Sequence, residues 1–310
     1  MAIDKNFYNE ASAAKLGWNP AWFGQREFDE NLVSAIKRWQ RKHNLKADGL
    51  CGPATYRRVW TQREHDSSKG APKSPTRLAA LAKERIVHNG QFYPIEWDKV
   101  ILWNEDDGLT CGAGTYASYA GKPDRKPTFF VNHWDVCLSA ESCARVIARR
   151  GISIHFCIDN DGTIYQLLDT QHAAYQAGSR KWNHASIGVE ISNAFYPKYQ
   201  SWYEKHGFGP RPVVDDARVH GRKLSTHLGF YPVQLEALKA LWAAINRAID
   251  IPLTCPTDDN GDLVTAVDPR CKSGKFKGFI NHYNLTRRKI DCAGLDLVGM
   301  LEDTKNERTT

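Results

Sequence analysis

Hydrophobic positions recur at helical spacing near the start of the chain. In residues 1–60, Leu32, Ile36 and Trp39 lie on one face of a predicted helix, and Asp29 stands at its N-cap position. Glycine and proline then mark a turn and the entry to another short helix. The pattern therefore predicts a small all-α helical domain over residues 1–60.

A polar segment separates this domain from a longer region, in which hydrophobic patterns typical of helices and of strands both occur. Residues 61–82 are rich in Ser, Lys, Gly and Pro, which predicts a flexible linker. Over residues 83–310, apolar segments predict strands and helices in alternation, typical of an α/β domain with one central sheet covered by helices. The strands are predicted at 128–132, 152–158, 163–168 and 186–192, and the helices at 139–150 and 232–249.

Composition narrows the class of protein. An apolar fraction of 42% supports packed cores, but no stretch approaches the roughly 20 apolar residues of a membrane span, so stable membrane insertion is not expected. The first ten residues lack the apolar segment of a signal peptide. The net charge of +7 fits either simple solubility or attraction to an anionic polymer, and no nucleic-acid-binding motif accompanies it.

The eight cysteines leave two alternatives open. Cys137 and Cys143, or Cys255 and Cys271, could form disulfides in an oxidising compartment, or all four could be reduced thiols. The chain has no Cys-x-x-Cys spacing. A structural zinc finger is therefore not expected.

Two segments about 150 residues apart contain the residue types of a zinc hydrolase. His133 ends a predicted strand, while His282 is followed by Lys289 and Asp291. Two imidazoles and a carboxylate with an open fourth position are typical of a catalytic zinc. Lys289 would be a cation suited to stabilising an oxyanion, and Glu190 could place a carboxylate beside the metal-bound water. The alternative for Lys289 is a place in a solvated basic loop, and the alternative for Glu190 is a paired structural carboxylate.

These segments resemble the zinc-dependent N-acetylmuramoyl-L-alanine amidases, a superfamily that includes peptidoglycan-recognition proteins and phage amidase lysins. The resemblance implies a mixed central sheet flanked by helices, with one zinc ion in a surface cleft. The residues that carry it follow the expected order: Phe130–His133, Ile154–Ile158, Asp161–Gln166, Ala177-Gly178, Asn183, Ser186–Glu190 and His282–Asp291.

The resemblance also implies roles for single residues. His133, His282 and Asp291 match the zinc ligands, and the alignment favours Asp291 over the adjacent Cys292. Some members place a tyrosine where this chain has Ile154; others use a glutamate at the position of Glu190. The implied mechanism is attack by zinc-activated water, with Glu190 as the base and Lys289 and the zinc stabilising the oxyanion.

Substrate contacts are the less defined part of the resemblance. His155, Gln176 and Asn183 match positions near the substrate. Gln176 replaces a histidine that relatives often have, and His172 is an alternative for that role. Residues 83–127 and 196–231 match no known pattern and are interpreted as insertions that could wall the substrate groove. The Cys137 and Cys143 positions match a disulfide of animal peptidoglycan-recognition proteins.

The N-terminal domain resembles small helical peptidoglycan-binding domains. Its motifs are Leu16-Gly17-Trp18, Phe28-Asp29, Ala35-Ile36, Trp39-Gln40, Leu45, Asp48-Gly49-Leu50 and Gly52–Thr55. Together the two resemblances imply a monomeric murein amidase with peptidoglycan as its partner. The arrangement is similar to phage endolysins, which wait in the host cytoplasm and reach the cell wall after the membrane is breached. A bacterial autolysin or recycling amidase, and a non-catalytic peptidoglycan-recognition module, are the alternatives.

Overall fold

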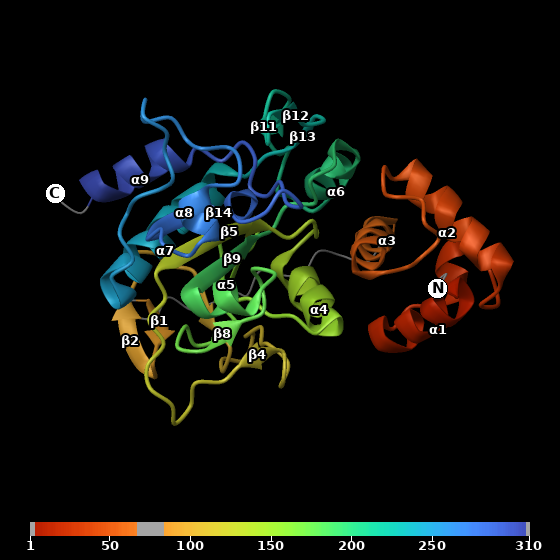
Figure 1. The fold of residues 1–310 in the computed structure, drawn as a ribbon, viewed down its shortest axis with the longest axis horizontal. Helices are drawn as coiled ribbons and strands as arrows, with labels where there is room; N and C mark the ends of the chain where they lie inside the picture. The colour runs from red at the N-terminus through yellow and green to blue at the C-terminus, as the bar shows by residue number, and fades with distance from the viewer. Residues whose placement is uncertain (1–3, 67–83, 308–310) are drawn as a thin grey trace.

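The computed structural model describes residues 4–66 and 84–307. It shows a small helical unit followed by a larger α/β unit (Figure 1). The helical unit contains α1 (Lys5–Leu16), η1 (Pro20–Phe23), α2 (Glu30–Lys42) and α3 (Pro53–Asp66). The predicted linker over 61–82 begins too early, because α3 continues to Asp66. The hydroxyl of Thr61 donates to the carbonyl of Val136 at 2.9 Å, which holds this last part of α3 against the larger unit. The rest of the predicted linker lies outside the described residues.

A buried glutamine organises the helical unit. Gln40, on α2, donates from Nε2 to Asp48 Oδ1, the Leu50 carbonyl and Thr55 Oγ1, at 2.9–3.1 Å. Its Oε1 accepts the backbone N–H of Gly49 at 2.9 Å. These bonds satisfy the polar groups of the loop between α2 and α3. They consequently fix the position at which α3 begins.

The larger unit is built on a six-stranded mixed sheet, with strand order β14-β5-β9-β6-β7-β3. Only the β6–β7 pair is antiparallel within this sheet. The mixed sheet confirms the predicted fold class. Its strands are β3 (Val100–Leu102), β5 (Phe129–Trp134), β6 (Phe156–Ile158), β7 (Ile164–Gln166), β9 (Ser186–Ile191) and β14 (Gly278–Asn281).

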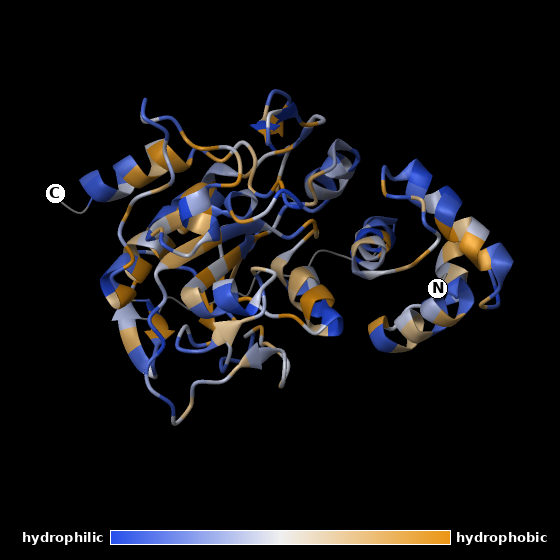
Figure 2. Ribbon diagram, viewed as in Figure 1, coloured by the Kyte–Doolittle hydropathy of each residue, from blue (hydrophilic) through white to orange (hydrophobic). Residues whose placement is uncertain are grey.

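Helices cover the two faces of the sheet. One face packs against α7 (Pro232–Ile249) and α9 (Leu297–Asn306), where Trp242 contacts the ring of Phe279. The other face packs against α4 (Ala140–Arg150), through a hydrophobic cluster that also includes residues of the helical unit. Ser139 caps α4, which is the helix predicted at 139–150. Figure 2 shows α2 and α4 with both hydrophobic and hydrophilic residues, as expected of helices that are buried on one side.

The two predicted insertions form shorter elements. Residues 83–127 also supply β3, which pairs in parallel with β7 at the edge of the main sheet, so this segment is partly integral to the fold.

No helix in the described part of the chain is long and apolar enough to cross a membrane. The remaining elements are β1 (Arg85–His88), β2 (Gln91–Pro94), β4 (Tyr116–Ala117), β8 (Ala173–Ala174), α5 (Arg180–Ala185), η2 (Pro197–Tyr199), α6 (Gln200–Lys205), β10 (Val213–Val214), β11 (Arg218–Val219), β12 (Arg222–Lys223), β13 (His227–Leu228), α8 (Pro269–Lys272) and η3 (His282–Asn284).

Candidate metal and catalytic site

Three adjacent parallel strands bring the predicted site residues together at their carboxyl ends. His133 on β5 is in register with Glu190 on β9. Asn281, the last residue of β14, is in register with Asn132 on β5, so the next residue, His282, comes alongside His133. Ligand sites in sheets with parallel strands commonly form at this edge. The topology therefore explains why residues so far apart in the sequence meet.

The contacts of a buried asparagine show which face of the sheet the site occupies. Asn132 accepts a hydrogen bond from Trp242 Nε1 on α7 at 3.2 Å and donates to the carbonyl of Ile280 at 3.1 Å. Successive side chains of a strand point to opposite faces. His133 therefore faces the side of the sheet that is covered by α4, away from α7.

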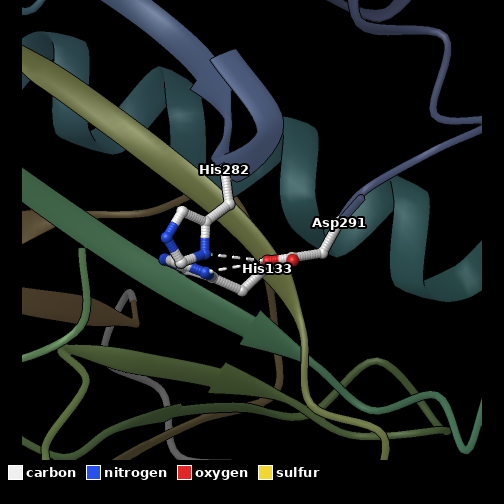
Figure 3. Close-up of side chains that lie close together, drawn as sticks. All are labelled: His133, His282 and Asp291. Carbon is white, nitrogen blue, oxygen red and sulfur yellow. Dashed lines mark hydrogen bonds and ion pairs between the residues drawn. The ribbon is translucent and has the colours of Figure 1, made fainter. Parts of the chain in front are cut away.

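His133, His282 and Asp291 form the candidate metal site (Figure 3). The Nδ1 atoms of the two imidazoles each lie 3.1 Å from Oδ2 of Asp291, and all three side chains are buried. Ligands about 2.0–2.2 Å from a tetrahedral zinc lie roughly 3.3–3.6 Å apart, so a slight widening of the two 3.1 Å separations would suit the ion. Two nitrogens and one carboxylate oxygen also match the donor types that zinc prefers.

Electrostatics favour a charged carboxylate within this group. Burial acts to raise the pKa of Asp291, but the charges of His282 and Lys289 and hydrogen bonds from both imidazoles hold it well below its usual value. Burial lowers the pKa of His282 to about 4. Burial also acts to lower the pKa of His133, yet the hydrogen bond to Asp291 and the nearby carboxylate charges raise it above its usual value. Protons and a metal ion would therefore compete at His133.

Gln176 determines which nitrogen of His133 carries the proton. His133 Nε2 makes a short hydrogen bond with Gln176 Oε1, an atom that can only accept, so Nε2 donates. If a metal ion replaces the proton on Nδ1, Nε2 keeps its own proton, and the lone pair of Nδ1 would face the position between Asp291 and His282. Gln176 is itself oriented by donating from Nε2 to Ser186 Oγ at 2.7 Å. This is the supporting bond expected around a metal-binding histidine.

The approach of Gln176 depends on a glycine in β9. A Cβ atom at Gly188 would lie 2.7 Å from both Cδ and Oε1 of Gln176, and 2.9 Å from Cδ1 of Ile154. Real Cβ contacts are essentially never that short. The glycine therefore leaves the space through which Gln176 reaches His133. The sequence motif contained this glycine, but its packing role required the structure.

A cavity of about 560 Å³ opens beside the candidate metal site. Glu190 and Lys289 both line it, as do His133, Gln176, His282 and Asp291. Oε2 of Glu190 is buried and has no hydrogen-bond partner within the described residues. Burial raises the pKa of Glu190, although the charge of His133 opposes this shift. A carboxylate with a raised pKa at a cavity wall is suited to accept a proton.

The loop that carries Lys289 is held by its backbone. The N–H of Lys289 donates to the Thr286 carbonyl at 3.3 Å, and its carbonyl accepts from His220 Nε2 at 3.0 Å. The positive charge of Lys289 acts to lower the pKa of Asp291 and of Glu190. Lys289 is therefore a cation of the site rather than part of a remote basic loop.

The other predicted substrate residues occupy supporting positions. His155 is buried outside the cavity lining; its Nδ1 accepts from the Gly188 N–H at 3.1 Å, and its Nε2 lies 3.0 Å from the His172 carbonyl. Asn183 Oδ1 accepts the N–H groups of Gln176 and Ala177 at 3.2 and 2.7 Å. Their contacts with substrate stay predictions.

The alternatives His172 and Cys292 are also outside the cavity lining. His172 stacks on Tyr116, with ring centroids 5.3 Å apart. Cys292 is fully buried, whereas the neighbouring Asp291 completes the group with the two histidines. The structure thus brings Asp291, rather than Cys292, to the candidate metal site.

Asp135, Cys137 and Cys143 form a second cluster of potential metal ligands. The Asp135 carboxylate already accepts the backbone N–H groups of Cys137 and Asn193, both at 2.9 Å, and Ser192 Oγ at 3.2 Å. The hydrogen bond to Cys143, together with burial, raises the pKa of Cys137 well above its usual value. Protonated thiols are poor metal ligands. In the structure Cys137, Cys143, Cys255 and Cys271 are all free thiols.

No sequence motif indicates that the helical unit lines the same cavity. Leu45, Pro53, Ala54, Arg57 and Arg58 form part of its wall. These residue types are common in helical domains, and they do not indicate which surface the domain packs against. Only the packing of α3 reveals their position.

Comparisons with known proteins found two family models that match this chain. The family model described as N-acetylmuramoyl-L-alanine amidase matches residues 123–287, just over half of the chain. A second model, described as a putative peptidoglycan binding domain, matches residues 14–59. No curated protein matches the chain.

Three solved structures with low sequence identity are similar to parts of the chain. AmpDH3 from Pseudomonas aeruginosa, in complex with anhydromuramic pentapeptide, is 18% identical over 64% of this chain and 66% of that chain, with a TM-score of 0.37. Staphylococcus aureus hydrolase AmiA, in complex with its ligand, is 10% identical over 68% and 84%, with a TM-score of 0.38. A mutant endolysin from Bacillus subtilis is 15% identical over 67% and 97%, with a TM-score of 0.36.

Proposed function

Because the chain belongs to the N-acetylmuramoyl-L-alanine amidase family, which hydrolyses peptidoglycan, we propose that His133, His282 and Asp291 hold one zinc ion per chain for this reaction. The observation that carries the proposal is the convergence of both Nδ1 atoms on Oδ2 of Asp291, beside a cavity. Zinc held there would act as a Lewis acid and make water a stronger nucleophile near neutral pH.

Glu190 is the proposed general base. Its free Oε2 atom is in the cavity wall, one strand away from His133. It would take the proton from water as the oxygen attacks the carbonyl between the muramic acid lactyl group and L-alanine. The same carboxyl group would then deliver a proton to the departing L-alanine amine. Ile154 leaves no tyrosine hydroxyl at the position where some relatives have one.

Lys289 is the proposed oxyanion partner. Its side chain lines the cavity with Glu190, and its charge acts on both carboxylates of the site. As negative charge develops on the carbonyl oxygen, a fixed cation stabilises the transition state more than the substrate. This difference raises the rate of the chemical step.

The residues around the metal site are proposed to orient it. Gln176 would hold His133 in the tautomer that presents Nδ1, and Asn183 would hold the backbone of Gln176. His155 would brace β9 through the N–H of Gly188. Direct substrate contacts of His155, Gln176 and Asn183 are secondary parts of the proposal.

Metal content and activity test this proposal together. Purified protein should contain one zinc per chain by elemental analysis and should lose amidase activity after dialysis against a chelator, with recovery on adding zinc. His133→Ala and Asp291→Ala should lose both zinc and activity, whereas His65→Ala, in the helical unit, should keep both. Full activity in metal-free protein would contradict the zinc assignment.

We also propose that the enzyme acts as a monomer on intact cell wall, as an endolysin does, with a wall-binding domain over residues 1–60. The peptidoglycan-binding match to residues 14–59 supports this setting, since such a domain has little use on soluble fragments. All the proposed catalytic groups come from one chain. Intact wall should be digested in preference to soluble muropeptides, and light scattering should give the monomer mass. Preference for soluble fragments would favour a recycling amidase instead.

A further inference from the structure

The helical unit is packed directly against the catalytic unit. Trp60 Nε1 on α3 donates to Ser142 Oγ on α4 at 3.2 Å. Arg58 Nη1 donates to Tyr199 OH at 3.0 Å, and its guanidinium carbon lies 3.1 Å from the centroid of the Tyr196 ring. One hydrophobic cluster joins residues of both units. These contacts fix the face of α3 that looks into the catalytic cavity.

Two arginines from the two units line that cavity. Arg57 comes from α3, and Arg150 is the last residue of α4. Nε of Arg150 is buried and has no hydrogen-bond partner in the part of the chain that the structure describes. Within the described residues, no hydrogen bond or ion pair is made by the guanidinium group of either arginine. A buried, charge-bearing donor without a partner is costly unless a ligand satisfies it.

The charges around the cavity favour an anion. Arg57, Arg150, Arg288 and Lys289 are available cations of its lining, whereas Arg58 is engaged by two tyrosines. The acidic residues of the lining are Glu190 and Asp291. Because a zinc ion would offset the charge of Asp291, the occupied site would be more cationic still. Guanidinium groups bind carboxylates through paired N–H donors.

We propose that Arg57 of the helical unit, together with Arg150, binds a carboxylate of the stem peptide next to the scissile bond. This inference rests on the proposed function, in which the muramoyl–L-alanine amide lies beside Glu190 and the candidate metal site. The stem peptide continues beyond L-alanine. Its second residue bears either a free carboxylate or, where that group is amidated, a carboxamide. The helical unit is then part of the active site, in addition to binding the wall.

The test uses the full-length protein and two synthetic muramoyl-peptides that differ only by a carboxylate or a carboxamide at the residue after L-alanine. Wild type should prefer the carboxylate. Arg57→Ala should raise KM for the carboxylate about tenfold, the loss expected for one charge-assisted hydrogen bond, and should leave KM for the carboxamide nearly unchanged. Arg57→Lys should recover part of the preference, because it keeps the charge without the paired donors.

The matched control is Arg63→Ala. Arg63 is on the same helix but lies over the ring of Trp22 and does not line the cavity, so both KM values should equal those of wild type. Arg150→Ala should also remove the preference, and its thermal midpoint shows whether it folds. Arg57→Ala is a separate variant and remains a test even if Arg150→Ala does not fold.

The outcomes separate this inference from the proposed function. If wild type cleaves both substrates with equal KM, or if Arg57→Ala changes both KM values equally, the carboxylate site is wrong but the amidase assignment stands. Faster cleavage of both substrates by Arg57→Ala would instead show that α3 covers the site as an inhibitor. If wild type releases L-alanine amino groups from neither substrate, the proposed function itself fails.

Discussion

His133 and Glu190 occupy the same register position on neighbouring parallel strands, β5 and β9. Their side chains consequently leave the same face of the sheet, and both line one cavity. His133 contributes to the candidate metal site, while Glu190 keeps a free oxygen. Through the rigid backbone of the sheet, the pairing would thus hold the proposed zinc site beside the proposed base.

Replacing Glu190 by glutamine should remove the base without removing the metal site. We expect kcat to fall about 10²- to 10⁴-fold, the usual contribution of general acid–base catalysis. Zinc content should stay at one per chain, since Glu190 is not one of the proposed ligands. Glu141→Gln on α4, where Glu141 forms an exposed ion pair with Arg145, is the matched control and should have wild-type kinetics. Equal activity of Glu190→Gln and wild type would rule out this base.

The pH profile should show the raised pKa of Glu190. Burial favours the neutral carboxyl group, whereas the base must be ionised, so activity should fall as the pH decreases through this raised pKa. The acidic limb of kcat/KM should therefore lie above the pH at which an ordinary glutamate titrates. Measurement must be made with zinc saturating at each pH, because protonation of His133 also opposes metal binding. A limb at the ordinary glutamate pKa would contradict the assignment.

Gln176 should support zinc affinity through His133. Loss of such a bond typically weakens metal binding 10- to 100-fold, so Gln176→Ala should raise the zinc dissociation constant by about that factor. Gly188→Ala should act in the same direction, because the added methyl group would displace Gln176. Competition with a chromogenic chelator measures both. Gln91→Ala, at an exposed position on β2, is the control. Unchanged zinc affinity in Gln176→Ala would show that the bond has no such role.

Lys289 should affect the chemical step more than substrate binding. Removing one oxyanion donor costs about 10²- to 10³-fold in kcat, and we expect a loss of this size for Lys289→Met with zinc retained. Arg287→Met changes an exposed cation two residues earlier that does not line the cavity, and it should behave as wild type. If both variants lost the same small factor, Lys289 would contribute only general positive charge.

Elements with a clear hydrophobic period could be predicted well. The helix expected at 232–249 is α7, Pro232–Ile249, and the strand expected at 186–192 is β9, Ser186–Ile191. Both have enough residues for a spacing to be recognised. In contrast, β3 has three residues, Val100–Leu102, which is too short to show any period. Its place in the main sheet depends on pairing with β7, far along the chain.

The candidate site could be predicted as a set of residue types but not as a geometry. The resemblance singles out His133, His282 and Asp291 together and places Gln176 near the substrate, but it does not predict the contact of Gln176 with His133. The wall formed by α3 could not be predicted, since it depends on contacts such as Trp60 with Ser142, 82 residues apart. Such contacts follow from the shapes of two folded surfaces, which no local pattern encodes.

The most direct test of the central claim is the identity of the bond that is cut. Purified peptidoglycan digested by the zinc-loaded protein should gain free L-alanine amino groups, detected by dinitrophenylation and hydrolysis, and chelation should stop their release. Glu190→Gln should release them far more slowly. New reducing sugar ends, with no new L-alanine amino groups, would contradict the account.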